Sequence, residues 1–470
     1  MARITNKTAT EKEDLAATLA RNIANVSYED IPADARESTK KSILDTLGVM
    51  AGASGLTPGL RELADLIKES GGREESSIIG FGGKVPAWMA AFVNGAMAHC
   101  LDYDDIDSDG PVHPSSPTVP AGFAVAERLG KVSGKKLITA ITLGNDLQCR
   151  LAISTPRKAT WHRTVVFGAF AAATVAGKLL DLDHQGMVDA LGLAFCQAAG
   201  TMELRFGVGS GIGGMYSAFP AKAGVLSAFM AQRGIAGIKT SMDGRAGLFP
   251  VYFDGECDRA VLTRDLGKRF EGVNTGYKAW PACAATHVYI DATLSLLQEN
   301  AIRARDIEGI TAYIGDQAQE LCEPLEFRRR PATSIDAKFS IPFTVAVAAA
   351  KGRVVIGDYT VQALQDKEVL RMAEKVMPRL DPRFNRGLRG MPPGMVEIKT
   401  TAGKTHQKRV DFPYGHPAKP ISTKDLNDKF RDCLSYSAKP PTGASVEKVI
   451  QMAGDLENVS DVAEMIRLLS

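Results

Sequence analysis

VPAWMAAFVNGAMAHCLDYDDID, residues 85–107, joins an apolar helical run to a group of acidic side chains. The part over 85–101 is apolar on all sides, which predicts a helix buried in the core rather than lying on the surface. The acidic side chains therefore stand where a core helix ends. They are accompanied by two histidines, and the group comprises Asp102, Asp104, Asp105, Asp107, Asp109, His99 and His113.

Two interpretations of this acidic group are open. Carboxylates crowded into a partly desolvated pocket have raised pKa values, which suits general acid or base catalysis. Alternatively the group caps the next helix, expected over 117–129, since Asp and Ser side chains accept hydrogen bonds from the first backbone N–H groups of a helix.

Composition limits the class of protein. The 470 residues, 45% hydrophobic and 23% charged, are typical of a globular chain with two or more domains. The net charge is +2 and the basic residues are scattered, so we expect no nucleic-acid partner. The longest apolar run, residues 165–177, is too short to span a bilayer, and the polar N-terminus does not resemble a signal peptide. Seven cysteines without a CxxC pair predict reduced thiols in a cytoplasmic protein.

The periodicity of apolar residues divides the chain. Helices are expected over 35–50, 134–151, 164–180, 187–199 and 219–233, and strands over 307–314 and 395–401. Further helices are expected over 422–435, with Ser422 as its cap, and over 446–468. The pattern predicts a mainly α protein, with a large helical domain from both chain ends (1–274 and 415–470) and a smaller inserted α/β domain (275–414).

Single motifs outside the acidic group are weak. GSGIGG, residues 209–214, matches GxGxxG by letter, but it follows a helical run, so a mobile active-site loop is favoured over a dinucleotide site. His162 and His287 each precede or begin an expected helix, where a histidine is usually a cap or a core residue. Lys278 and Lys338 have apolar and aromatic neighbours and are candidates for holding a substrate carboxylate. No HExxH is present, which favours chemistry without a metal.

In combination, these segments resemble the MmgE/PrpD family, whose activities are those of 2-methylcitrate dehydratase, cis-aconitate decarboxylase and iminodisuccinate epimerase. The resemblance runs over nearly the whole chain. It is carried by Asp102-Tyr103-Asp104-Asp105 to His113-Pro114-Ser115, Trp161-His162 to Gly168, Lys278-Ala279-Trp280-Pro281 to Thr286-His287, Ala337-Lys338-Phe339-Ser340-Ile341-Pro342-Phe343, and Gly415-His416-Pro417.

The resemblance implies a homodimer in which the smaller α/β domain is a lid, with the active site in the cleft between the two domains. It implies a cofactor-independent site whose catalytic residues are Asp102, His113, His162 and His287. The family shares proton transfer at a carbon next to a carboxylate, which requires a positioned base and stabilisation of the developing negative charge. We expect His113 or His162 to move the proton, Asp102 to orient that imidazole, and His287 to complete the site.

The expected reaction is elimination of water from a small di- or tricarboxylic hydroxy acid. Decarboxylation of a cis-aconitate-like acid and epimerisation of a dicarboxylate are the alternatives, and a dimer that binds a metabolite without turnover is the alternative from another class. Two departures bear on the substrate. The lysine of some relatives is missing near Gly213, and the loss of this cation should weaken binding of a third carboxylate, which favours a dicarboxylate or a less charged acid. An aromatic hydroxyl of some members is replaced by Phe343.

Overall fold

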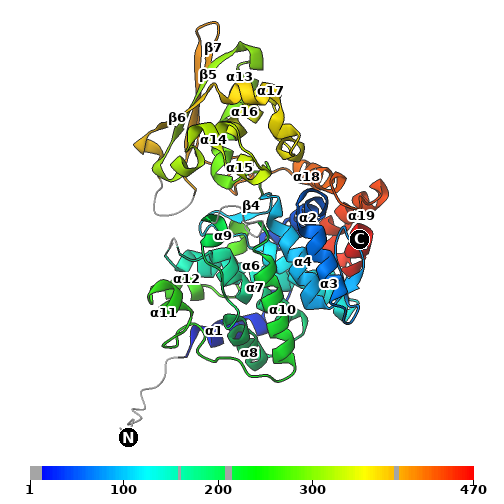
Figure 1. Cartoon of the computed structure of the whole chain (residues 1–470). Helices are drawn as coiled ribbons and strands as arrows, with labels where there is room; N and C mark the ends of the chain where they lie inside the picture. The colour runs from blue at the N-terminus through cyan, green and yellow to red at the C-terminus, as the bar shows by residue number, and fades with distance from the viewer. Residues whose placement is uncertain (1–12, 157–159, 207–213, 386–390) are drawn as a thin grey trace.

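The computed structural model describes residues 13–156, 160–206, 214–385 and 391–470. Figure 1 shows a helical body, which carries the C-terminus, and a smaller region that stands above it and is built on a sheet. The expected GxGxxG-like loop lies mostly outside the described residues. The fold is mainly helical with small sheets, as the periodicity predicts.

The helical body is formed by the first twelve helices and the last three. They are α1 (Leu15–Asn25), α2 (Ala33–Leu56), α3 (Leu60–Glu69), α4 (Ala87–Cys100), α5 (Ser115–Leu129), α6 (Gly134–Ser154), α7 (Arg163–Leu179), α8 (His184–Phe195), α9 (Glu203–Phe206), α10 (Ala218–Gln232), α11 (Leu248–Phe253), α12 (Arg259–Thr263), α18 (Thr423–Ser435), α19 (Gly443–Gly454) and α20 (Ala463–Leu469). The five helices expected between residues 35 and 233 correspond to α2, α6, α7, α8 and α10. Helix α4 is buried over most of its length, as its uniform apolar sequence predicts.

Glycines allow the C-terminal helix α18 to approach α2 closely. A Cβ atom on Gly52 would lie 2.8 Å from the carbonyl oxygen of Cys433, and one on Gly55 would lie 2.0 Å from that of Tyr436. Because such distances are shorter than any real Cβ contact, only glycine permits this packing. The return of the tail to the helical body is confirmed, while the exact limits of the two domains stay a prediction.

The smaller region holds a four-stranded sheet in the order β6-β5-β7-β8. The strands are β5 (Ile307–Ile314), β6 (Val376–Leu380), β7 (Gly394–Thr400) and β8 (Thr405–Val410), and β6 is parallel to β5 whereas the other pairs are antiparallel. The helices of this region are α13 (His287–Glu299), α14 (Leu325–Arg329), α15 (Ser334–Lys338), α16 (Ile341–Lys351) and α17 (Lys367–Ala373). Both expected strands are confirmed as β5 and β7.

One expected helix is wrong. The run predicted over 446–468 is two helices, α19 and α20, with an intervening segment that leaves the helical path. In this segment the carbonyl of Val459 accepts a hydrogen bond from Gly134, and the N–H of Val462 donates to Val132. These backbone groups are therefore satisfied by the start of α6 and its preceding loop rather than by a continuous helix.

A short pairing connects the acidic segment to the boundary between the two regions. Strand β3 (Ile106–Asp107) is antiparallel to β4 (Thr275–Gly276), which directly precedes the Lys278 motif. The other two-stranded sheet, β1 (Ser76–Ser77) with β2 (Lys84–Val85), lies before α4. The β3–β4 pairing places residues far apart in sequence at one site.

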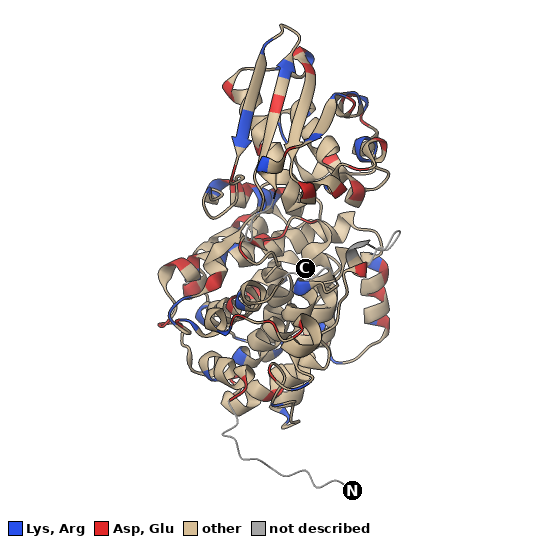
Figure 2. Cartoon of the chain, turned by 90° about the vertical axis from the view of Figure 1, so that its left-hand side faces the viewer, with Lys and Arg blue, Asp and Glu red and all other residues tan. Residues whose placement is uncertain are grey.

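Two general expectations concern charge and thiols. Figure 2 shows Lys and Arg interspersed with Asp and Glu over both regions, as the scattered basic residues of the sequence indicate. All seven cysteines are free thiols, and four of them are buried.

Of the helices in the described part of the chain, none combines the length and the apolar character needed to cross a membrane.

Candidate active site

The turn after α4 is clamped by three buried lysines. Asp102 has φ of 49°, a left-handed conformation that is uncommon outside glycine and costs roughly 1–3 kcal/mol. Three successive carbonyl oxygens at this turn each accept a hydrogen bond from one lysine Nζ. The pairs are Leu101 with Lys338 at 2.7 Å, Asp102 with Lys278 at 2.9 Å, and Tyr103 with Lys429 at 2.6 Å.

Two of these lysines also form ion pairs with buried carboxylates. Lys278 Nζ lies 2.5 Å from Asp102 Oδ1, and Lys429 Nζ lies 2.6 Å from Asp45 Oδ1. Burial alone would raise the pKa of Asp102, but the charge of Lys278 outweighs burial and leaves this pKa below its ordinary value. The second oxygen of Asp102 accepts no hydrogen bond from the described residues. The site thus holds an ionised carboxylate, one oxygen of which is buried without a hydrogen-bond partner among the described residues.

Lys338 is the third lysine, and no carboxylate of the described ranges forms an ion pair with it. Its side chain is buried, and burial lowers its pKa to about 8. The charge of Asp102 opposes this shift without forming an ion pair, and a further anionic group would stabilise the buried cation. Lys278 and Lys338 are both predicted to bind substrate. The structure brings them to the same turn beside Asp102.

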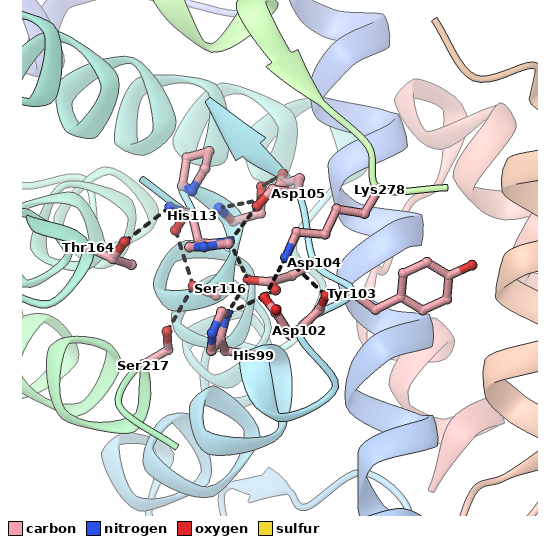
Figure 3. A network of polar contacts seen from close by, with 12 residues as sticks. His99, Asp102, Tyr103, Asp104, Asp105, His113, Ser116, Thr164, Ser217 and Lys278 are labelled. Atoms are coloured by element: carbon pink, nitrogen blue, oxygen red, sulfur yellow. Dashed lines mark hydrogen bonds and ion pairs between the residues drawn. The ribbon is translucent and has the colours of Figure 1, made fainter. Parts of the chain in front are cut away.

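Asp104 is fully buried and lies between two imidazoles (Figure 3). Its carboxylate oxygens lie 2.9 Å from Nδ1 of His99, and its Oδ2 lies 3.1 Å from Nδ1 of His113. Burial would raise the pKa of Asp104, but His113 and His99 hold this pKa well below its ordinary value. Asp104 is therefore a carboxylate that accepts hydrogen bonds from both rings.

The same contacts determine which nitrogen of His113 carries the proton. Nδ1 of His113 also lies 2.8 Å from the carbonyl oxygen of Asp105, and a carbonyl oxygen only accepts hydrogen bonds. Nδ1 is therefore protonated, and Nε2 of the neutral ring carries the lone pair that takes up a proton. This is the tautomer that a carboxylate-supported general base requires.

Neighbouring helices hold the backbone of His113. Its N–H donates to Oγ1 of Thr164 at 3.2 Å, and its carbonyl accepts from Oγ of Ser116 at 3.1 Å. Oγ of Ser116 in turn lies 2.8 Å from Oγ of Ser217. Figure 3 marks this contact with a dashed line. The side chain of His113 is 14% exposed, whereas that of Asp104 is fully buried. The backbone of His113 is therefore fixed by neighbouring helices, while its side chain keeps a small exposed fraction.

The ring of Tyr216 links His162 to this group. Its centroid lies 4.1 Å from that of His162 and 4.3 Å from that of His99, and the rings of His99 and His113 are 4.5 Å apart. His162 stands at the N-terminus of α7, yet its side chain makes no capping hydrogen bond there. The capping role that is usual for a histidine in this place is therefore wrong for His162.

His287 begins α13 in the smaller region. Its Nε2 lies 3.1 Å from the carbonyl oxygen of Ala282, so Nε2 carries the proton, and its ring packs on Trp280. Burial and then the charge of Lys278 lower its pKa to about 3. His287 is therefore neutral at physiological pH and offers Nδ1 as an acceptor.

The capping interpretation of the acidic group is confirmed for one residue, while a catalytic role for the others stays a prediction. Asp105 accepts hydrogen bonds from the N–H and the hydroxyl of Ser115 at the start of α5, which is the capping role. Asp107 accepts from the N–H groups of Asp109 and Gly110 and closes a turn. Burial raises the pKa of each, in both cases to about 7. Asp102 and Asp104 are instead the ionised carboxylates, which contact Lys278 and His113 respectively.

Three members of the site were given no individual role from the sequence, although His99 and Asp104 belong to the acidic group. Asp104, rather than Asp102, is the carboxylate in contact with His113, and Asp102 is instead paired with Lys278. His99 and Tyr216 were not proposed. Two signals in the sequence could have identified them. His99 and Asp104 stand on either side of the end of the apolar helix, and Tyr216 follows the place where some relatives have the lysine. Phe343 is fully buried in α16, with its ring 6.4 Å from that of Tyr359.

His99, Asp104 and His113 are also a group that could hold a metal ion, since one ligand atom of each lies within 4.8 Å of the others. A metal on Nδ1 of His113 would displace the proton that this nitrogen donates to Asp105. The hydrogen-bond pattern therefore favours a proton-transfer site over a metal site.

Comparison with known proteins extends over most of the chain. The family model for the MmgE/PrpD N-terminal domain matches residues 17–260, and the model for the MmgE/PrpD C-terminal domain matches residues 280–453. The residues of the site described above lie within these two matches, except Lys278, which falls between them.

Curated relatives are similar at low identity. Cis-aconitate decarboxylase of Aspergillus terreus is 24% identical, over 98% of this chain and 96% of the relative. Cis-aconitate decarboxylase of Homo sapiens is 27% identical over 92% and 90%. 2-Methylcitrate dehydratase of Salmonella typhimurium is 23% identical over 83% and 84%. These relatives are enzymes of two different reactions.

Proposed function

This chain belongs to the MmgE/PrpD family, and we propose that it is a cofactor-independent lyase that eliminates water from a small di- or tricarboxylic hydroxy acid. The observation that carries this proposal is the contact of Asp104 with His113, which sets the Nδ1–H tautomer and leaves Nε2 as the proton acceptor. Proton removal next to a carboxylate is the step that such a base serves.

Asp104 stabilises the reaction electrostatically. When Nε2 of His113 takes the substrate proton, the ring becomes a cation, and the buried charge of Asp104 lies 3.1 Å from it. A preorganised charge at this distance lowers the free energy of the protonated base without reorganisation of solvent. His113 is therefore the base, and His162, joined to it through Tyr216 and His99, supplies the proton for the leaving hydroxyl.

The substrate carboxylates bind to the cationic side of the site. Lys338 has no carboxylate partner among the described residues, and Lys278 has one, so an incoming anion adds the missing negative charge. Asp102 orients Lys278, and His287 accepts a hydrogen bond from the substrate. In the balanced reaction, the carbon loses a proton to His113, a double bond forms, and hydroxide leaves as water with a proton from His162.

Decarboxylation of a cis-aconitate-like acid is the second candidate. The cis-aconitate decarboxylases match more of this chain than the 2-methylcitrate dehydratases do, 92–98% against 73–83%. In this reaction carbon dioxide leaves and the resulting carbanion takes a proton, for which the same imidazoles serve. The protein is expected to act as a homodimer in a reducing compartment, in keeping with the family resemblance and its seven free thiols.

Proton NMR in deuterated water tests the proposal. The protein is incubated with citrate, 2-methylcitrate, cis-aconitate and malate, and a His113→Gln protein purified in parallel is the control for contaminating enzymes. We expect deuterium at a carbon next to a carboxylate and an unsaturated product with wild type only. An inverted product would favour the epimerase alternative, and binding of an acid without exchange or product would favour the non-catalytic alternative.

A further inference from the structure

His99 is a buried histidine to which the proposed chemistry assigns no proton transfer. It lies in the last turn of α4 and is 7% exposed. Its Nδ1 is 2.9 Å from each oxygen of Asp104, so it holds the carboxylate through both oxygen atoms. A histidine that merely filled the core would not share its partner with the base of the reaction.

The charge of His99 suits a supporting role. Burial lowers its pKa, so the ring is neutral and donates a hydrogen bond without adding a positive charge. A lysine or arginine at this place would pair with Asp104 and cancel the charge that stabilises the protonated His113. A neutral donor fixes the plane of the carboxylate and leaves its negative charge to His113.

His99 also touches both other imidazoles of the site, one directly and one through Tyr216. Its ring lies 4.5 Å from that of His113, and the ring of Tyr216 stands between His99 and His162, at 4.3 and 4.1 Å. Without His99, Asp104 would lose a hydrogen bond, and Tyr216, which packs against His162, would lose a ring contact. In Figure 3, His99 and His113 approach Asp104 from different directions.

We infer that His99 is a positioning residue, which holds Asp104 and Tyr216 so that His113 and His162 face the substrate in fixed orientations. The inference rests on the proposed function, because it assigns the proton transfer to His113 and His162. It assigns no contact between His99 and the substrate, and so predicts that a neutral hydrogen-bond donor of the same reach can replace the imidazole.

Two substitutions separate this role from a structural and from a catalytic one. In His99→Asn the side-chain amide takes the place of Nδ1 and donates to Asp104, whereas His99→Leu has similar bulk and no donor. We expect His99→Leu to lower kcat by about 10- to 100-fold with little change in KM, as for other residues that orient a reacting group. His99→Asn should recover most of kcat. His406→Asn and His406→Leu, on strand β8, are the matched controls.

Crystal structures of the two variants give a readout that needs no substrate. The contact between Asp104 and His113 should persist in His99→Asn and be lost in His99→Leu. An unchanged contact in His99→Leu, or a kcat of His99→Asn as low as that of His99→Leu, would overturn the inference. A wild-type protein that turns over none of the acids would contradict the proposed function, while the crystal structures would still decide the role of His99.

Discussion

Replacement of Asp104 by Asn removes one charge from the centre of the site and changes its shape little. The carboxylate is fully buried and 3.1 Å from Nδ1 of His113. At that distance, with an effective dielectric constant of about 20, two unit charges attract by roughly 5 kcal/mol. Each 1.4 kcal/mol is about tenfold in rate, so the upper limit of the effect on kcat is about 10⁴-fold.

The loss should be smaller than this limit but still large. The side chain of His113 is 14% exposed, so water screens part of the attraction. An amide at position 104 also offers only one acceptor oxygen to two Nδ1–H donors, and its NH₂ group faces the other ring. We expect kcat to fall by about 10²- to 10³-fold, with a far smaller change in KM.

The assay is the rate of deuterium entry and product formation, measured by NMR for wild type and Asp104→Asn at equal concentration. Asp109→Asn is the matched control, because Asp109 lies in the same loop and is exposed. Circular dichroism and the unfolding temperature check that both variants are folded. A folded Asp104→Asn protein with kcat within threefold of wild type would refute the electrostatic role of this carboxylate.

Four further predictions address binding, stability and metal. Burial lowers the pKa of Lys338 to about 8, so this cation is lost and KM should rise as the pH increases through 8. In Lys338→Met, KM measured from pH 6 to 9.5 should no longer show this rise. The pKa of Asp105 is raised to about 7 in the folded state, so its contribution to stability is present at low pH and is lost as the pH rises through 7. The unfolding temperature should fall less from pH 5.5 to 8 in Asp105→Asn than in wild type, and an equal fall would be inconsistent with a buried neutral Asp105. Gly55→Ala should lower the free energy of unfolding by about 1–3 kcal/mol, whereas Gly454→Ala, which meets no atom within 4 Å, should raise it by up to about 1 kcal/mol in urea titrations. Dialysis against EDTA should leave turnover unchanged, since Nδ1 of His113 carries a proton; loss of turnover restored by a divalent metal would contradict that assignment.

The sequence was sufficient for the helical architecture. The apolar pattern is local, and it located α4, α6, α7 and α10 to within a few residues, as well as strands β5 and β7, while α2 continues beyond its expected end to Leu56. The division of 446–468 into two helices was not local, because hydrogen bonds to the residues before α6 decide it.

Residue types also determined much of the site. Asp102, His113, Lys278 and Lys338 were named from motifs, and the structure brings all four to the turn after α4 or to the acidic segment that follows it. Motifs identify such residues because charged and imidazole side chains in apolar surroundings need a reason to be there.

Only the tertiary structure decided which partner each carboxylate contacts. Four aspartates within six residues are nearly equivalent in the sequence, yet Asp102 pairs with Lys278, Asp104 with two imidazoles, and Asp105 caps α5. Their partners come from α4, from the start of α5 and from the segment after β4, so no local pattern contains the answer. A pKa and a role follow from the charge and burial around each carboxyl group, and these exist only when distant parts of the chain are folded together.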